Sequence, residues 1–555
     1  MKSKRNDATL NKRRVLMQGA GAAAAAGIFP FSTRLAMSAV VEESPVVETK
    51  SGKLRGLRRD GVFTFKGIPY GQPTGGVNRF MPPIAATPWT GVRDALDYGA
   101  RAPQNERPSA APHVAWIRDT RPASEDCLVL NVFTPALKDG ARRPVMVYIH
   151  GGGFISGSSG ATGIDGSNLA KNGDVVVVSM NHRLNVFGHC YLGAFDKRFA
   201  DSGNVGMLDL VAALKWVRDN VAQFGGDAGN VTIFGQSGGA SKVAVLMAMP
   251  DAKGLFHKAI VQSASSLLRM APAQDAERAA YAILAELNLD KSQAAELQRV
   301  PADKLLAAMS ASIKETGIDN NRPTVDGRSL PTHPFDPTAP ALSADVPLLI
   351  GTCETETAFD FSQNPKNFSL NADEARARVK FLLGLDDAGT DRMIAAYKRT
   401  HPNATPSELV IYIFSDYKYR QNDIKAAELK AAQGGAPAFM YLFTWRTPVL
   451  DGNLKTPHTL CIPFVFGTVD IATGITGNSP TRFALSEKVQ KAWVAFARSG
   501  NPGHSGLPQW KPYSAAERTT MIFDNECKAV NDPAGADRIA INTAPFYVAE
   551  VAGRR

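Results

Sequence analysis

A serine between glycines stands at the centre of the stretch Val231 to Leu246. The residues before it, Val231 to Phe234, are β-branched or aromatic and predict a short buried strand. The apolar residues after it predict the start of a helix. Between them, Gly235-Gln-Ser237-Gly-Gly239 matches G-x-S-x-G, which is typical of a sharp strand-to-helix turn that presents a nucleophile. Glycines are needed there because the serine backbone is strained and the strand and helix pack closely. Ser237 is therefore the predicted nucleophile.

A serine hydroxyl is a poor nucleophile at neutral pH. It needs a base within hydrogen-bond reach, and that base needs a carboxylate to orient it. It also needs N–H donors directed at the oxyanion that forms during the reaction. Because the chain has 48 glycines, the five-residue pattern can arise by chance, and the other parts of the sequence must decide.

The oxyanion donors are predicted in His150-Gly-Gly-Gly-Phe154, which directly follows the apolar run Pro144 to Ile149. That run predicts a strand buried on both faces. Consecutive glycines let main-chain N–H groups approach a substrate oxygen with no side chain in the way. We expect Gly152 and Gly153 to donate, with Gly238 as the third donor.

The carboxylate is expected just beyond a later strand, Val346 to Ile350. Two acids follow it in Gly351-Thr-Cys-Glu-Thr-Glu, namely Glu354 and Glu356. Strand alternation directs both side chains the same way, so their spacing does not choose between them.

The base is one of nine histidines, and in this type of site it comes last along the chain. Three histidines lie beyond Glu356. His401 and His504 lie in polar turns, whereas His458 lies in Lys455 to Phe466, where a loop passes into a strongly apolar segment. We therefore predict His458 as the base.

The elements that would position these residues alternate between buried strands and helices. This pattern predicts a mostly parallel sheet covered on both faces. Helical regions at 275–320 and 372–434 are expected as insertions, and 68–125 as a long ordered loop region. No internal repeat or flexible linker interrupts the chain, so we expect one domain over 40–555. Further predicted strands are 47–57, 62–67, 128–134, 174–180, one beginning at 259, and 439–445, and further predicted helices are 207–224 and 486–498.

Composition and charge limit the classes of ligand that the protein is expected to bind. The chain has 555 residues, 44% of them hydrophobic, and a formal charge of +10. Residues 1–39 hold seven basic residues and one acidic residue, and the remainder holds 55 and 51. Because the body has no Lys/Arg-rich run, nucleic-acid binding is not expected. The five cysteines form no C-x-x-C pair or Cys/His cluster, so their pattern predicts no metal site.

The first 39 residues resemble a bacterial twin-arginine export signal. Arg13-Arg14 precedes a mildly apolar run from Gly19 to Phe31, and small residues follow at Ala36 to Ala39. Cleavage is expected after Ser38 or Ala39, with a periplasmic or secreted product. The alternative is an uncleaved anchor or a disordered leader. No other stretch is long and apolar enough for a membrane span, so none is expected in the mature chain.

Taken together, these motifs resemble the type-B carboxylesterases, the family that includes the cholinesterases and bacterial broad-range esterases. The resemblance covers nearly all of 45–530. The matching segments are Phe65-Lys-Gly-Ile-Pro-Tyr70, Pro88-Trp-Thr-Gly-Val92, Glu125-Asp-Cys-Leu-Val-Leu-Asn-Val132, His150 to Phe154, Asn181-His-Arg-Leu184, Gly203-Asn-Val-Gly206, Phe224-Gly-Gly-Asp227, Gln262-Ser263, His458 to Phe466 and Trp493 to Gly500.

The resemblance implies an α/β-hydrolase fold, in which helices flank a mostly parallel central sheet and helical insertions lie over the active site. It places the acid at the fifth position after Gly351, which is Glu356 rather than Glu354. It makes His458 the base and suggests Ser263 as a supporting hydroxyl near the acid. It implies a small-molecule ester as substrate, with no metal and no organic cofactor.

The chain departs from the family pattern at four positions. Gln236 stands where a glutamate is usual, which removes a negative charge beside the nucleophile and argues against a cationic, choline-type substrate. Thr357 replaces a glycine and Cys461 replaces an acid. Cys127 matches a cysteine that is normally bridged to one upstream, but none precedes it here, and Ala102 lies near the expected partner. That disulfide is therefore expected to be absent.

We expect a serine carboxylesterase that works through an acyl-enzyme. A lipase, an amidase or a carbamate hydrolase on the same triad remains open, because specificity would lie in loops 68–125, 275–345 and 360–435. A non-catalytic cholinesterase-like binding protein is the remaining alternative. The oligomeric state does not follow from the sequence.

Overall fold

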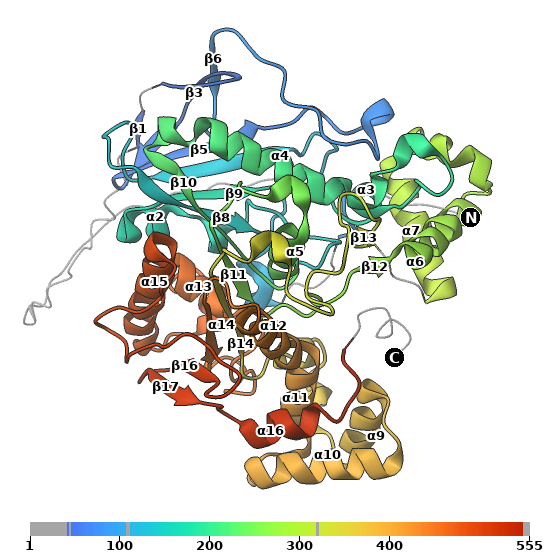
Figure 1. Cartoon of the computed structure of the whole chain (residues 1–555), viewed down its shortest axis with the longest axis vertical. Helices are drawn as coiled ribbons and strands as arrows, with labels where there is room; N and C mark the ends of the chain where they lie inside the picture. The colour runs from blue at the N-terminus through green and yellow to red at the C-terminus, as the bar shows by residue number, and fades with distance from the viewer. Residues whose placement is uncertain (1–40, 44–45, 107–110, 318–320, 548–555) are drawn as a thin grey trace, which may run out of the picture. The chain divides into compact units, whose positions relative to one another are not determined.

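A twelve-stranded sheet runs through the protein (Figure 1). The structure, a computed structural model, describes residues 41–43, 46–106, 111–317 and 321–547, all of which belong to one compact unit beginning at Val41. The predicted export signal, residues 1–39, lies outside the described residues. The strands, in spatial order, are β1 (Val41–Glu43), β4 (Leu57–Arg59), β5 (Val62–Pro69), β7 (Val129–Thr134), β9 (Val176–Met180), β8 (Arg143–Ile149), β10 (Gly226–Gln236), β11 (Lys258–Gln262), β14 (Leu348–Cys353), β15 (Ala438–Phe443), β16 (Thr519–Phe523) and β17 (Lys528–Asn531).

The central part of this sheet is parallel, as predicted. Every neighbouring pair from β9 through β16 runs parallel. The strands before β9 in spatial order and the last strand, β17, pair antiparallel. Parallel strands bring their carboxyl ends to the same edge of a sheet, and in open α/β sheets ligands bind outside that edge.

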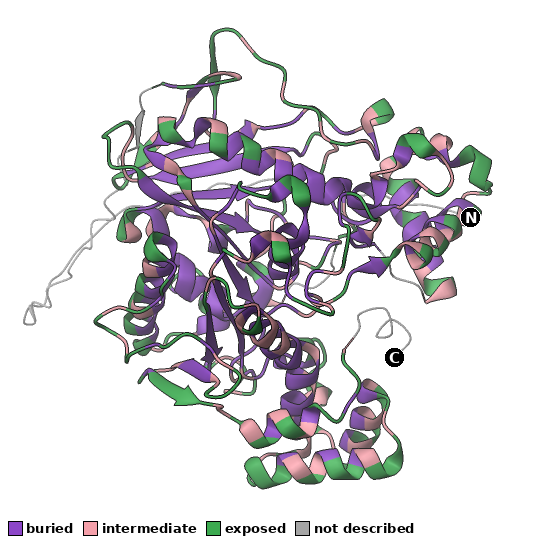
Figure 2. Ribbon diagram, viewed as in Figure 1, coloured by how far each residue is buried: buried purple, intermediate pink, exposed green. Residues whose placement is uncertain are grey.

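Helices cover both faces of the sheet, which explains the continuous apolar runs. In β8, Val145, Val147 and Ile149 pack into one core cluster, whereas Met146 and Tyr148 pack into another. Figure 2 shows the central strands of the sheet as continuously buried. The first cluster includes α4 (Val205–Asn220), α5 (Gly238–Ala248) and α12 (Gln421–Ala432), and the second includes α2 (Ser167–Gly173), α13 (Cys461–Phe466) and α15 (Thr481–Ser499).

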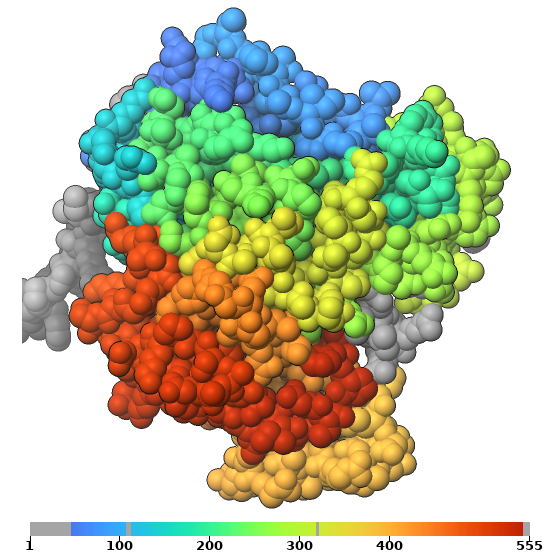
Figure 3. Space-filling view, viewed as in Figure 1, coloured from blue at the N-terminus to red at the C-terminus, as the bar shows by residue number. Residues whose placement is uncertain are grey.

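Two helical insertions interrupt the strand order. The first, between β11 and β14, holds α6 (Ala273–Glu286), η7 (Lys291–Gln298) and α7 (Ala302–Thr316), which pack with α3 (Asn185–His189). The second, between β14 and β15, holds α8 (Ala358–Phe361), α9 (Ala372–Leu383), α10 (Asp387–Thr400), α11 (Pro406–Ser415), the π-helical turn η10 (Asp416–Arg420) and α12. Figure 3 shows α9 and α10, in gold, projecting at the margin of the described unit beside the red C-terminal segment with α16 (Gly535–Ile541).

The N-terminal strands differ from the prediction. Instead of one strand over 47–57, the structure has β2 (Val47–Thr49), β3 (Gly52–Arg55) and β4. β3 belongs to a separate three-stranded sheet and β4 to the twelve-stranded one, and between them a side chain at Gly56 would come within 2.4 Å of the Thr64 carbonyl oxygen. The predicted loop region 68–125 contains η1 (Gly76–Asn78), β6 (Val92–Asp94) and α1 (Pro112–Ala115). The strands β16 and β17 were not predicted.

All five cysteines are buried free thiols. Among the described residues, no helix is both long and apolar enough to cross a membrane.

Candidate active site

The turn after β10 has the strained backbone that its sequence predicts. Ser237 has φ 59° and ψ −126°, and α5 begins at the next residue. Its N–H donates to the Gln262 carbonyl, 2.8 Å away, at the end of β11. A Cβ on Gly239 would lie 2.0 Å from the Ile149 carbonyl oxygen, and one on Gly235 would lie 2.5 Å from the Gly239 carbonyl carbon. Both positions therefore require glycine. The half-buried Ser237 makes no side-chain hydrogen bond to any residue that the structure describes.

Strand register gathers the predicted site residues. Gly235 in β10 pairs with Ile149 in β8 and Val261 in β11, and Gln262 pairs with Gly351 in β14. The carboxyl ends of four neighbouring strands therefore meet at one edge. The segments that follow them carry the glycine run, the serine, Ser263 and the two candidate acids.

The loop 150–157, here called the glycine loop, lies directly on the N-terminus of α5. A Cβ on Gly238 would come 2.2 Å from the Gly153 carbonyl oxygen, so the two segments touch backbone to backbone. Within the described part of the chain, the N–H groups of Gly152 and Gly153 donate to no acceptor. Gly238 is the first residue of α5, so its N–H has no intrahelical acceptor. The three predicted donors are thus brought together.

Three hydrogen bonds, accepted by two carbonyls, orient the donors within the glycine loop. The His150 Nδ1–H lies 2.9 Å from the Gly151 carbonyl, and the Gly152 carbonyl accepts from the backbone and the hydroxyl of Ser156, each at 3.1 Å. Because C=O and N–H point in opposite directions across a trans peptide, fixing these carbonyls fixes the N–H groups of Gly152 and Gly153. Burial, together with the charge of Lys242, lowers the pKa of His150 to about 3, so its ring is neutral.

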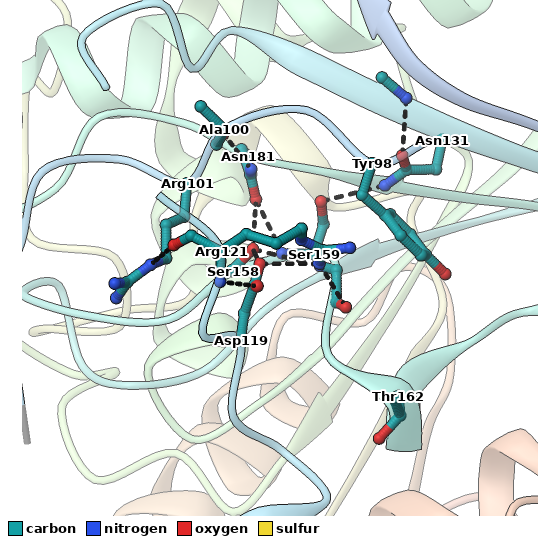
Figure 4. Close-up of polar contacts among 12 residues, drawn as sticks. Tyr98, Ala100, Arg101, Asp119, Arg121, Asn131, Ser158, Ser159, Thr162 and Asn181 are labelled. Carbon is teal, nitrogen blue, oxygen red and sulfur yellow. Dashed lines mark hydrogen bonds and ion pairs between the residues drawn. The ribbon is translucent and has the colours of Figure 1, made fainter. Parts of the chain in front are cut away.

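A polar network anchors the chain just beyond the glycine loop (Figure 4). The Ser158 hydroxyl donates to Asp119 at 2.6 Å, and the Ser159 N–H donates to the Asn181 side chain at 2.7 Å. Asn131 donates to the Ser159 hydroxyl at 3.1 Å. Asn131 and Asn181 both belong to segments that resemble the family. Through these contacts, the two segments hold the chain that follows the glycine loop in place.

The structure pairs His458 with Glu356. Glu356 is fully buried, and one carboxylate oxygen accepts from His458 Nδ1–H at 2.5 Å. The other carboxylate oxygen accepts from the backbone N–H of Cys353 at 2.7 Å. In addition, the backbone N–H of His458 donates to the backbone carbonyl of Glu356 at 3.0 Å. Glu354 instead faces Arg446, 3.8 Å away, and burial raises its pKa. The geometry therefore distinguishes the two acids that strand alternation left open.

Three side chains surround the His458 ring. The Gln236 amide nitrogen lies 3.2 Å from Nε2 and 3.3 Å from Nδ1, so it sits over the ring face and not along either lone pair. The Tyr419 ring lies 4.8 Å away and the Phe359 ring 6.2 Å away, centroid to centroid. Both aromatic residues come from the second insertion, and Tyr419 belongs to η10, a π-helical turn of the kind often found at functional sites.

Ser263 and Asp423 lie near the acid without contacting the histidine. Ser263 is buried with φ 58°, and its N–H donates to the Gly351 carbonyl. Its hydroxyl has no hydrogen-bond partner among the described residues, so the structure shows no hydrogen bond from Ser263 to Glu356. Asp423, which sequence reasoning missed, is fully buried, and burial and the charge of Glu356 raise its pKa well above the usual range. In the sequence, Asp423 could have been found as an acidic residue next to the apolar Ile424 in a predicted helix.

Two of the departures from the family pattern have structural partners. The Thr357 hydroxyl donates to the Ile411 carbonyl at 3.1 Å, and its N–H donates to the Ser415 hydroxyl at 3.0 Å, so it ties the acid loop to α11. The Cys461 thiol accepts from the Gln262 amide at 3.4 Å. Over the described ranges, no group of three or more His, Cys, Asp or Glu residues is arranged to hold a metal ion.

Comparison with known proteins identifies the family. Residues 43–541 match the model of the carboxylesterase family. The chain belongs to the carboxylesterase family. This carboxylesterase is 36% identical over 499 residues to the para-nitrobenzyl esterase of Bacillus subtilis, a match that covers 89% of the chain and 97% of the relative. It is 31% identical over 510 residues to the phenmedipham hydrolase of Pseudarthrobacter oxydans, covering 90% and 99%.

A solved structure agrees. The carboxylesterase EST55 of Geobacillus stearothermophilus matches with a TM-score of 0.77 and 37% identity, covering 90% of this chain and all of the other. The predicted α/β-hydrolase fold is therefore confirmed. The protein is a carboxylic ester hydrolase, as predicted.

Proposed function

We propose that this carboxylesterase hydrolyses esters through an acyl-enzyme on Ser237, with His458 as general base, Glu356 as its orienting acid, and Gly152, Gly153 and Gly238 as oxyanion donors. The observation that carries the proposal is the 2.5 Å hydrogen bond between His458 and the fully buried Glu356. It sits beside a strained serine turn and three backbone N–H groups that donate to no acceptor among the described residues.

In acylation, the Ser237 hydroxyl attacks the ester carbonyl carbon while His458 Nε2 takes its proton. Glu356 accepts from Nδ1–H, which leaves Nε2 as the basic nitrogen and stabilises the imidazolium that forms. The developing oxyanion accepts hydrogen bonds from the three glycine N–H groups, and the N-terminus of α5 favours its charge. The imidazolium then protonates the leaving alkoxide, and the alcohol departs.

Deacylation repeats these steps with water as the nucleophile. His458 takes a proton from water, the second tetrahedral intermediate occupies the same oxyanion donors, and Ser237 leaves with the proton. In the free enzyme the Gln236 amide occupies the space next to Nε2. Catalytic hydrogen bonds often tighten only when substrate binds. We therefore expect the Ser237–His458 contact to form in the substrate complex.

The surroundings of the serine favour neutral or anionic esters. The residue before Ser237 is an uncharged glutamine whose amide faces the base, and no carboxylate other than Glu356 contacts the His458 ring among the described residues. A cationic alcohol group would find no counter-charge at this position. The triad does not distinguish esters from amides, carbamates or long-chain lipids.

The test combines labelling with a substrate series. We expect a fluorophosphonate to label the wild-type protein covalently and to leave Ser237→Ala unlabelled. On nitrophenyl esters of rising acyl length, Ser237→Ala should lose about 10³-fold or more of the wild-type kcat. Equal rates for the two proteins would refute the nucleophile, and the chain-length profile of the wild type would separate esterase from lipase behaviour.

We also propose that residues 1–39 direct export by the twin-arginine route, giving a periplasmic or secreted enzyme. The paired Arg13-Arg14 before a mildly apolar run supports this. A reporter fused after residue 39 should be exported, and replacing both arginines with lysine should retain it inside the cell. Export of both forms would contradict the route.

A further inference from the structure

A buried lysine lies under the oxyanion donors. Lys242 is in α5, a helix of eleven residues that are all buried, and its side chain is fully inaccessible. Helical side chains lean toward the N-terminus of their helix. From its position one turn after Gly238, Lys242 therefore reaches back to the place where the glycine loop lies on the helix.

The contacts of Lys242 are with the glycine loop itself. Its Nζ donates to the Gly153 carbonyl at 2.8 Å and to the His150 carbonyl at 3.2 Å, and it lies 5.5 Å from the centre of the Phe154 ring. These two carbonyls lie on either side of the peptides that carry the Gly152 and Gly153 N–H groups. One ammonium thus holds both ends of the donor segment against α5.

The burial of the Lys242 side chain makes the free energy of folding less favourable. Burying an ammonium without a carboxylate partner costs free energy that an apolar side chain in the same helix would not. Burial lowers the pKa of Lys242 to about 7. The neighbouring histidines that face it, His150, His182 and His189, are neutral, because burial lowers the pKa of each one. The residue is therefore not explained by an ion pair or by packing.

We propose that Lys242 is a positioning residue for the oxyanion hole. Its Nζ turns the His150 and Gly153 carbonyls toward the helix, and so keeps the intervening N–H groups directed at the reacting oxygen. The inference rests on the proposed function of Gly152 and Gly153 as donors. Lys242 does not touch the substrate in this proposal and transfers no proton.

The protein contains a matched control. Lys430, in α12, is also buried, and its Nζ donates to the Ser343 and Ala344 carbonyls at 2.9 and 2.8 Å. Burial lowers the pKa of Lys430 to about 8. Lys430→Met therefore removes the same kind of contact, but from a place with no contact to the glycine loop among the described residues.

The experiment compares Lys242→Met with Lys430→Met on a nitrophenyl ester. For Lys242→Met we expect kcat to fall about 10²-fold with KM little changed, because the lost interaction acts in the transition state. Its melting temperature should stay close to that of the wild type, since removing an unpaired buried charge offsets the loss of two hydrogen bonds. Affinity for a trifluoromethyl ketone, whose adduct fills the oxyanion site, should fall in parallel with kcat. Lys430→Met should keep the wild-type kcat.

Several results would overturn the inference. They are a wild-type kcat in folded Lys242→Met, an equal loss in Lys430→Met, or an unchanged affinity for the ketone. If Lys242→Met does not fold, Lys242→Gln takes its place; because its shorter side chain keeps an N–H donor, we expect a smaller fall in kcat, again with KM little changed. A wild-type protein that neither hydrolyses the ester nor reacts with fluorophosphonate would instead refute the proposed function.

Discussion

The amide of Gln236 lies against the ring of the proposed base, His458, and carries no charge. We expect a charge at this position to change how the activity varies with pH. In Gln236→Glu a carboxylate over the His458 ring would stabilise the imidazolium, which is the form that cannot accept the serine proton. We expect the acidic limb of the kcat/KM profile to move to higher pH by about one unit. The activity of Gln236→Glu, relative to the wild type at the same pH, would then be lower at pH 6 than at pH 8.

The profile of kcat/KM against pH for Gln236→Glu and for the exposed control Gln363→Glu provides the check. The control should follow the wild type. A limb that moves to lower pH would show that the amide does not face the base in solution. A rise in the relative rate on a choline ester would also be expected of Gln236→Glu, because the new charge supplies the missing counter-ion.

The two acids after β14 give a second prediction at this scale. Glu356→Gln removes the charge that holds His458 in the reactive tautomer, and we expect kcat to fall by about 10³ to 10⁴-fold. Glu354→Gln, whose carboxylate faces Arg446, should stay close to the wild type. Steady-state rates on one ester suffice to measure both. The reverse ranking would mean that the acid assignment is wrong.

At the scale of elements, the turn between β10 and α5 depends on backbone contact. Gly239→Ala would place a methyl group 2.0 Å from the Ile149 carbonyl, and neither strand nor helix is free to move. We expect it to lower the free energy of unfolding by about 3 kcal/mol. Urea denaturation measures this. The exposed Gly229, where a Cβ would meet only the flexible Asp227 side chain at 3.3 Å, is the control and should tolerate alanine.

The same elements show how far a sequence predicts a fold. The parallel strands were predictable because each is a run of apolar residues covered on both faces. The pair β16 and β17 was missed because β17 is exposed throughout, as an edge strand can be. The run 47–57 was read as one strand because its alternation hid the turn between β2 and β3 and the change of sheet between β3 and β4.

The site was predictable where chemistry and chain order coincide, as for Ser237, His458 and the glycine loop. The two acids were not separable by alternation because β14 ends at Cys353 and residues 354–357 form a turn, where a period of two no longer holds. Lys242, Tyr419 and Asp423 were missed since their roles arise from contacts between segments far apart in sequence. A charged residue inside an apolar helix was the available signal for Lys242.

At the scale of the whole molecule, the C-terminal helix is held to the second insertion by a titratable contact. His401 lies at the end of α10, and its Nε2 is 2.9 Å from Oδ2 of Asp537 in α16. The hydrogen bond to Asp537 raises the pKa of His401. The stabilisation is therefore fully present below the pKa of an unfolded histidine, about 6.5, and is lost as pH rises through the higher folded value.

Asp537→Asn removes the charge that the protonated histidine needs. We expect the loss of melting temperature, relative to the wild type, to be larger at pH 6 than at pH 9. Calorimetry at the two pH values tests this. A loss that is the same at both, or larger at pH 9, would show that the contact is not ionic in the folded protein.

The five buried free thiols have a consequence for where this enzyme can be made and used. No disulfide contributes to the stability of the described fold, which rests on non-covalent contacts. Burial shields the thiols from oxidants in the folded protein, and Cys353 and Cys461 contact each other as thiols. The stability of the folded enzyme should thus not require an oxidising environment. Recombinant enzyme produced in a reducing cytosol should match exported enzyme in activity and stability, with or without a reductant in the assay.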